Sequence, residues 1–392
     1  MAQKKLTDKQ CKEVLSAYEK HGFQTKAADA IGMNRGTFLH RYAEAVKRFG
    51  DVKPDSKLQI EAERTRKVSR DKLKETTGLL NQSEKELIEL RKTVDMLTGV
   101  SKVKPRKIVT KQKESDHEAV PHLLASDWHC EEQVLPEQLG GIYNKYTPDI
   151  FKTSADAFFR NGLTLIKQQA PYIKIKECVL IFGGDMITNS LHEENKHTNF
   201  MGPAKATALA YESMLSGVDF LLNSTEYKWT IICKPGNHGR ATKEMFSAIS
   251  NDYSWEYLIY KMMANRYQNE PRVNFVLDES YHTYFNCYGF IERIHHGDGV
   301  KFGGGVGGIT IPINKAISAW NQATVADLDV MGHFHQYTDG ENFIVNGSLI
   351  GVNPWGLKMK FKPEPPKQTM YIIDSKYGKT ARFPIFIRDN KQ

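Results

Sequence analysis

The sequence has few cysteines and no long hydrophobic segment. Its five cysteines are scattered, with no Cys-x-x-Cys pair, which argues against a disulfide framework. No apolar run approaches the ~20 residues that cross a bilayer. The charged stretch at residues 1–5 does not resemble a secretory signal. We therefore expect a cytoplasmic protein that binds no membrane, with reduced and mostly buried thiols.

Charge is divided unevenly along the chain. The first 120 residues hold 27 Lys and Arg against 18 Asp and Glu, whereas the remainder holds 27 against 28. A basic region joined to a nearly neutral one indicates an appended segment that binds a polyanion. With 392 residues, the chain has room for two or three domains.

Five short polar fragments stand out in the nearly neutral part. They are 126–129 (Ser-Asp-Trp-His), 183–185 (Gly-Gly-Asp), 236–238 (Gly-Asn-His), 296–297 (His-Gly) and 332–335 (Gly-His-Phe-His). Apolar runs such as 179–182 and 229–233 precede them, as expected for strands that deliver polar side chains at their carboxyl ends. Carboxylate, amide and imidazole donors suit Mn²⁺, Fe or Zn²⁺, and the lack of thiolate argues against a structural zinc site.

The order and content of these fragments resemble the calcineurin-like metallophosphoesterases, over roughly residues 121–390. The resemblance implies an α/β fold in which two sheets form a sandwich flanked by helices. It also implies two divalent metal ions, Mn²⁺ first, with Fe, Zn²⁺ and Mg²⁺ as alternatives. It assigns one ion to Asp127, His129 and His335, the other to Asn237, His296 and His333, and a bridging role to Asp185.

The resemblance also implies a mechanism. Two ions about 3.5–4 Å apart bind phosphate oxygens and lower the pKa of a water molecule. His238 is then the catalytic residue that stabilises the transition state or protonates the leaving group. His295 competes with His296 as a ligand, but the family places the ligand directly before glycine. Arg240 and Asp298 are candidates for contact with the phosphate or with the metal ligands. Alternatively, they are ordinary loop charges with no catalytic role.

Two fragments depart from the protein Ser/Thr phosphatase branch of that family. The third continues as Gly-Arg instead of with an acidic residue, and the second lacks an arginine shortly after its Gly-Asp. The Gly-Asn-His-Gly-Arg form is similar to phosphoesterases of bacteriophages and prophages. That similarity implies DNA as the substrate, and a bacterial host cytoplasm as the location.

Residues 1–52 are predicted to form a helix-turn-helix module. Thr7 and Gln10 form a capping box for a first helix, whereas Thr25 and Asn34 can cap a second and a third. Small alanines, a Gly turn and two apolar residues within 27–39 fit such a motif.

The third helix of this module would expose side chains suited to DNA. They are Arg35, Thr37, His40 and Arg41. A three-helix bundle that uses its basic face for protein contact is the alternative.

Residues 53–98 are predicted to form one long helix. Apolar residues at 73, 80, 87 and 94, with others at 90 and 97, give a coiled-coil pattern that is convincing over 80–97. It predicts a homo-oligomer through residues 80–97 or packing on the catalytic domain. Residues 99–119 are predicted to be a basic linker.

Residues 120–392 are predicted to form the phosphoesterase domain. We expect amphipathic helices at 151–170, 204–222 and 245–267, and strands of a second sheet at 272–277, 327–330 and 342–345.

Three functions are compatible with these features. The first is a two-metal DNA phosphodiesterase, a nuclease targeted by the N-terminal module. The second is a phosphoesterase acting on nucleotides or other small phosphate esters. The third is a DNA-binding regulator or assembly protein that keeps the fold as a scaffold, which the complete set of site residues disfavours.

Overall fold

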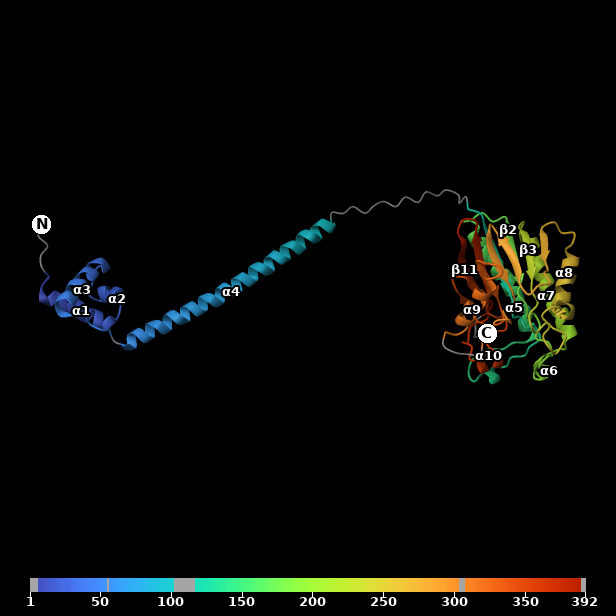
Figure 1. The fold of residues 1–392 in the computed structure, drawn as a ribbon, viewed down its shortest axis with the longest axis horizontal. Coiled ribbons are helices and arrows are strands. Elements are labelled where there is room, and N and C mark those ends of the chain that lie inside the picture. The colour runs from blue at the N-terminus through green and yellow to red at the C-terminus, as the bar shows by residue number, and fades with distance from the viewer. Residues whose placement is uncertain (1–5, 55, 102–116, 303–306, 389–392) are drawn as a thin grey trace. The chain divides into compact units, whose positions relative to one another are not determined.

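The structure, a computed structural model, describes residues 6–54, 56–101, 117–302 and 307–388. The chain divides into two compact units, Met1–Thr110 and Lys111–Gln392, and Figure 1 labels their elements where there is room. Within the described residues, no helix combines the length and apolar character that a membrane span requires.

The first unit begins with α1 (Asp8–His21), α2 (Gln24–Ala30) and α3 (Arg35–Phe49). The predicted capping box of Thr7 and Gln10 is present, and the Asn34 side chain accepts a hydrogen bond from the Thr37 amide at 3.2 Å. The predicted cap at Thr25 is wrong, because α2 begins at Gln24 and Thr25 lies inside its first turn.

A small core holds these three helices together. Val14 of α1, Ala27 and Ala28 of α2 and Phe38 of α3 are fully buried in one cluster. The two alanines let α2 approach its neighbours closely. Gly32 adopts φ +62° between α2 and α3, a left-handed conformation in which other residues are strained.

The long helix α4 (Ser56–Ser101) extends three residues beyond the predicted end at 98. Five apolar residues of its heptad pattern are 53–67% exposed: Leu73, Leu80, Leu87, Leu90 and Val94. The side chain of Leu97 and residues 102–116, most of the predicted linker, lie outside the described residues. Self-association through 80–97 therefore stays a prediction.

The second unit is a two-sheet α/β sandwich, as predicted. The order of its first sheet is β11-β10-β1-β2-β3-β4. The parallel part contains β1 (Ala119–Ala125), β2 (Glu177–Phe182), β3 (Lys228–Cys233) and β4 (Val273–Val276), and the antiparallel edge contains β10 (Lys367–Asp374) and β11 (Gly378–Phe386). Placing 272–277 in the second sheet was wrong, because β4 pairs with β3.

The order of the second sheet is β5-β6-β7-β9-β8. Its strands are β5 (Thr283–Cys287), β6 (Phe290–Ile294), β7 (Leu328–Met331), β8 (Thr338–Asp339) and β9 (Phe343–Val345). The predicted strands at 327–330 and 342–345 correspond to β7 and β9. Because β6 and β7 are parallel, their carboxyl ends lie at the same edge of the sheet.

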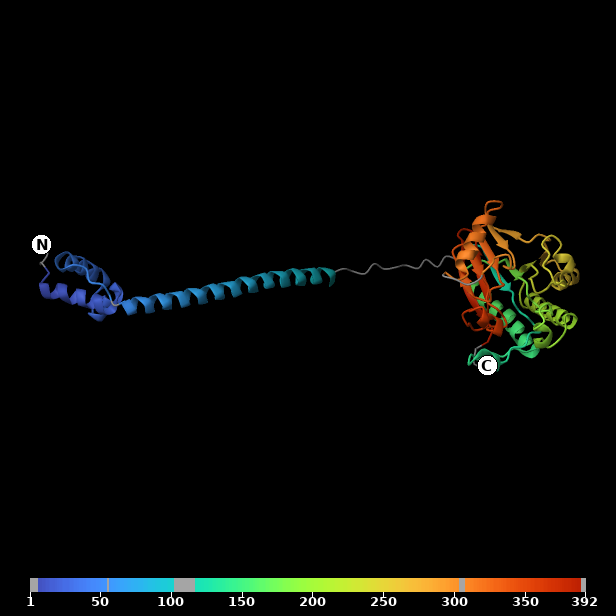
Figure 2. The ribbon, with the colours of Figure 1, turned by 60° about the horizontal axis from the view of Figure 1, so that its bottom comes forward.

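Apolar side chains fill the space between the sheets, including Leu124 and Ile181 of the first and Val330 and Ile344 of the second. Figures 1 and 2 show helices on both outer sides of the sandwich. The first sheet packs on α5 (Pro148–Gln169), α7 (Pro203–Ser224) and α8 (Trp255–Arg266), and the second on α9 (Thr310–Trp320). Shorter helical turns are η1 (Pro136–Leu139), α6 (Asn195–Thr198), η2 (Asn251–Tyr253) and α10 (Pro354–Lys358).

The helices predicted at 151–170 and 204–222 match α5 and α7 closely, but the helix predicted at 245–267 is wrong in its first half. Residues 245–254 form a loop that contains η2. The helix α8 begins only after Ser254, whose hydroxyl accepts a hydrogen bond from the Tyr257 amide at 3.2 Å.

Candidate metal centre

The five polar fragments converge where the strands of both sheets end. Asp127 and His129 follow β1, Asp185 follows β2, and Asn237 and His238 follow β3. His296 follows β6 of the second sheet, and His333 and His335 follow β7. The two sheets therefore contribute their carboxyl-end loops to a single site.

The backbone of this site is strained. Five of the seven predicted ligands adopt positive φ angles, although none is glycine: Asp127 (55°), His129 (48°), Asp185 (55°), His333 (67°) and His335 (53°). Such conformations cost about 1–3 kcal/mol each and cluster at functional sites. Folding stability alone would not select this arrangement.

The glycines of two fragments allow the loops to approach each other closely. A Cβ on Gly236 would lie 2.1 Å from Oδ1 of Asp185, and a Cβ on Gly184 would lie 2.4 Å from the backbone nitrogen of Gly236. The Asp185 and Asn237 side chains can share one site only because these positions have no side chain.

Two groups of donors lie side by side. In the first, made of Asp127, His129 and His335, the two Nε2 atoms are 3.2 Å apart, and Nε2 of His335 is 3.4 Å from Oδ1 of Asp127. In the second, made of Asp185, His296 and His333, Nε2 of His296 is 2.9 Å from Oδ2 of Asp185. Within each group the ligand atoms lie within 4.8 Å of one another, so each can hold one divalent cation.

Asn237 lines the same cavity as His296 of the second group. Its Oδ1 atom is buried and has no hydrogen-bond partner among the described residues. A buried oxygen without a partner loses its hydration without compensation, at a cost of about 1–3 kcal/mol. A cation held by Asp185 and His296 would satisfy it.

Three imidazoles are oriented through their other nitrogen. Nδ1 of His296 is 2.8 Å from the Gly183 carbonyl oxygen, and Nδ1 of His129 is 3.0 Å from the Thr188 hydroxyl. Nδ1 of His238 is 2.9 Å from the Thr188 carbonyl oxygen. Such contacts leave Nε2 for a metal or a substrate and are usual around metal-binding histidines.

The electrostatics of the site favour cations. Burial alone would raise the pKa of Asp185, but His296 and His238 outweigh it and hold this pKa well below its usual range. Burial lowers the pKa of His129, and His335 lowers it further, so its ring is neutral and free to bind metal. Burial opposes protonation of His296 too, but Asp185 prevails and raises its pKa, and a bound cation would compete with that proton.

Sequence reasoning missed the buried carboxylate of Glu256, in the first turn of α8. It accepts hydrogen bonds from the amides of Asp185 at 3.3 Å and Gly236 at 2.7 Å, and so joins the loops after β2 and β3. Burial, and then the Asp185 carboxylate, raise the pKa of Glu256 to about 7. Glu131 similarly accepts the amides of Thr188 and Asn189, at 3.0 and 2.6 Å.

His295 lies in a different environment from His296. Its ring packs against Trp320 and His282, with ring centroids 4.9 and 5.3 Å away, and its Nε2 is 3.4 Å from Oδ1 of Asp329. His296 alone of the pair joins the second ligand group.

Arg240 and Asp298 line a cavity beside the second ligand group. The cavity has a volume of about 630 Å³ and reaches Asn237 and His296. Arg240 donates hydrogen bonds to the carbonyls of Asn237 and Lys243, while Asp298 accepts one from the Tyr281 hydroxyl at 3.0 Å. A second cavity of about 340 Å³ adjoins His333.

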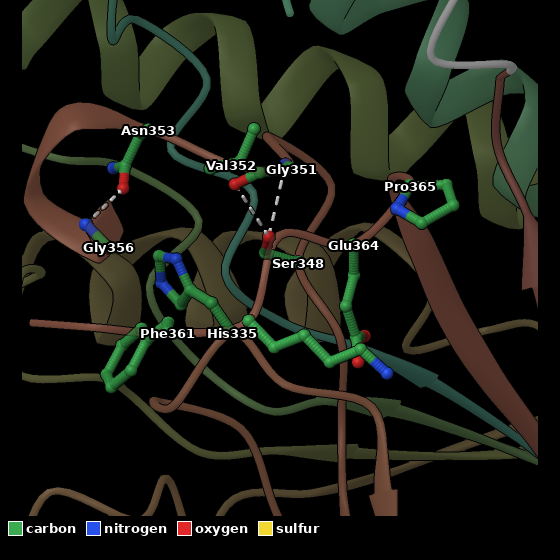
Figure 3. A pocket seen from close by; sticks show the side chains of 10 residues that line it. His335, Ser348, Gly351, Val352, Asn353, Gly356, Phe361, Glu364 and Pro365 are labelled. Carbon is green, nitrogen blue, oxygen red and sulfur yellow. Dashed lines mark hydrogen bonds between the residues drawn. The ribbon is translucent and has the colours of Figure 1, made fainter. Parts of the chain in front are cut away.

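A third, much smaller cavity lies beside His335. Figure 3 shows this imidazole near Asn353 and Phe361, with the Ser348 hydroxyl bonded to Gly351. Its volume of about 20 Å³ suits roughly one water molecule. This cavity is too small for a substrate, whereas the two larger cavities adjoin the second ligand group at His296 and His333.

The predicted DNA-contacting residues lie in the other unit. Arg35, Thr37 and His40 of α3 are exposed and Arg41 is partly exposed, so all four are accessible to a partner.

No protein-family model matches the sequence, and no curated protein is significantly similar to it. Similar solved structures include vacuolar protein sorting 29 from Cryptosporidium parvum, with 14% identity, 68% of this chain and 97% of that chain covered, and a TM-score of 0.28. A predicted phosphoesterase from Streptococcus pneumoniae is 12% identical, with a TM-score of 0.27, and the match covers 68% of this chain and 90% of that one. A 5′-nucleotidase precursor from Thermus thermophilus is 10% identical, with a TM-score of 0.26, and the match covers 68% of this chain and 54% of that one. These low values assign no activity to this chain.

Proposed function

We propose that this protein is a divalent-metal-dependent phosphoesterase that hydrolyses phosphodiester bonds in DNA. The observation that carries this proposal is the pair of donor groups on strained loops, with the partnerless amide oxygen of Asn237 beside the second group. Oxygen and nitrogen donors without thiolate favour Mn²⁺, with Fe, Zn²⁺ and Mg²⁺ as alternatives. Two such ions would supply Lewis-acid stabilisation of the phosphate and a water of lowered pKa.

His238 is the proton donor in this proposal. It is only partly buried, its ring centroid is 5.0 Å from that of His129, and its backbone amide donates to Oδ1 of Asp185 at 2.8 Å. When Nδ1 donates to the Thr188 carbonyl oxygen, Nε2 is the nitrogen free to carry a proton to the leaving oxygen. The same contact fixes the orientation of the ring.

DNA as the substrate is supported by the first unit. The first 120 residues carry the net positive charge of the chain, and α3 presents Arg35, Thr37, His40 and Arg41 after a glycine turn. Basic side chains on one helix are suited to phosphate contacts and to the major groove. The first unit would then bring the catalytic unit to DNA.

The decisive experiment is a cleavage assay with Mn²⁺ and end-labelled single- and double-stranded DNA. We expect cleavage that requires the metal and disappears in Asp185→Ala. Replacing Mn²⁺ in turn by Zn²⁺, Fe²⁺ and Mg²⁺ identifies the preferred ion. Absence of metal-dependent cleavage of both DNA forms would refute the proposal.

The second candidate function is hydrolysis of nucleotides or other small phosphate esters. The cavity of about 630 Å³ favours it, because this volume lies in the range of small-molecule sites. Faster turnover of cyclic nucleotides or small diesters than of any DNA would support it over the first.

A further inference from the structure

The cavity of about 630 Å³ has an aromatic wall that is firmly held. Trp320 packs on His282, with ring centroids 4.6 Å apart, and lies 5.2 Å from the Arg293 guanidinium. The Tyr281 hydroxyl donates to Asp298 at 3.0 Å and accepts from the Gly299 amide at 2.8 Å. Both rings are therefore oriented before any ligand arrives.

A second pair of rings lines the same cavity from the loop at 245–254. Phe246 and Tyr253 meet edge to face, with centroids 5.2 Å apart. They are 39% and 44% exposed, and neither belongs to a core cluster of the described residues. Their placement at a cavity that reaches Asn237 and His296 indicates a role in binding, since packing does not account for it.

The polar lining of the cavity favours an anion with a planar part. Arg240 and Lys301 line it against a single carboxylate, that of Asp298, whereas the buried Lys234 ammonium donates to the Asp278 and Ser280 carbonyls. Aromatic rings for stacking, together with cations for phosphates, are the combination by which proteins bind unpaired nucleotides. A fatty acyl chain would not need the cations, and a sugar phosphate would not need four aromatic rings.

We propose that this cavity holds an unpaired nucleobase of single-stranded DNA, next to the phosphodiester that the metal centre cleaves. The inference rests on the proposed function and narrows its substrate. In a duplex, a base reaches such a cavity only after it is unpaired and unstacked, which costs a few kcal/mol. Single-stranded DNA avoids the unpairing part of this cost.

The test compares two labelled single-stranded polymers of equal length and charge, oligothymidylate and a deoxyribose phosphate chain without bases. We expect the full-length protein with Mn²⁺ to cleave oligothymidylate roughly 5- to 150-fold faster, the range that stacking of one base supplies. The double variant Phe246→Ala, Tyr253→Ala should lose most of this preference. Tyr172→Ala, a 73% exposed tyrosine outside the cavity, and the ring-retaining Tyr253→Phe should keep it.

A binding measurement separates this proposal from the activity. Fluorescence anisotropy of the metal-free protein with the same polymers should show tighter binding of oligothymidylate, and the double variant should reduce that difference. Equal cleavage of both polymers, equal cleavage of duplex and single strands, or an unchanged preference in the double variant would each overturn the proposal. If no polymer is cleaved but the base-dependent binding remains, the proposed function fails while the nucleobase site stands.

Discussion

The two units of the chain differ in their backbone strain and in the kind of side chain that they bury. In the described part of the first unit, only glycines adopt positive φ, and its buried residues form two small, almost wholly apolar clusters. In the second unit, five of the seven predicted ligands adopt left-handed backbone conformations, and acidic and imidazole groups are buried together. The described part of the first unit thus shows no left-handed strain outside glycine, whereas the second unit uses stability from its large core to hold a strained site.

The comparison predicts that changes in the second unit alter chemistry, and the largest effect is expected at Asp185. Asp185→Ala should reduce metal content in both groups, as expected for a bridging carboxylate, and activity should fall by more than the roughly 10²–10⁴-fold of a lost general acid. Metal analysis of purified protein measures the first effect. His335→Ala is the matched control and should weaken chiefly one ion. Two ions at full occupancy without Asp185 would contradict the bridging role.

The next largest effect is expected at His238. His238→Asn should keep the metals and the fold but lower the rate by roughly 10²–10⁴-fold, because it removes a proton donor and no ligand. Steady-state kinetics together with metal content distinguish this from a structural defect. A loss below about tenfold would show that His238 is not the proton donor.

Removal of the first unit should affect DNA binding and spare the chemistry. Without residues 1–110, hydrolysis of a small chromogenic phosphodiester should be nearly unchanged, because every predicted ligand lies in the second unit. The salt dependence of DNA affinity should flatten by about 0.9 in log–log slope for each phosphate that the protein no longer neutralises. Arg35→Ala and Arg41→Ala in the full chain should reproduce part of that change. An unchanged affinity and slope would assign the first unit to protein contact.

The exposed stripe of α4 is expected to join two or more copies of the chain. Leu87→Ser should weaken self-association tenfold or more, since a buried leucine contributes about 2–5 kcal/mol. Analytical ultracentrifugation of the full-length protein checks this. Ile88→Ser is the control, because Ile88 is equally exposed at 54% but lies outside the heptad positions. Equal effects of both changes, or a wild-type monomer, would rule out the coiled coil.

The smallest effect concerns the start of α3. Asn34→Ala removes the side-chain acceptor for the Thr37 amide and should cost the first unit about 1 kcal/mol of unfolding free energy. Thermal or urea unfolding of the isolated unit measures it, and Asn34→Ser should restore most of the loss. Activity on the small diester should not change in the full chain.

Some parts of the molecule were predictable because their causes are local. The capping box at Thr7 and the cap at Asn34 depend on residues three positions apart, and both are present. The predicted helix over residues 245–254 failed for the opposite reason. Met245, Phe246 and Ile249 have a helical spacing, but they are 39–56% exposed, and the first two line the cavity. A periodic apolar pattern does not show whether the side chains face a core or a binding site.

The sequence by itself determined which residues are candidates for the metal centre, because each closely follows the strand that positions it. Only the tertiary structure decided how they are grouped, since His296 and Asp185 meet at 2.9 Å only when the ends of two sheets come together. The tertiary structure also revealed Glu256, which lies twenty residues beyond Gly236 and reaches its amide across the fold at 2.7 Å. Ligand identity depends on local chemistry, whereas metal geometry and substrate selection depend on contacts between segments that are distant in the sequence.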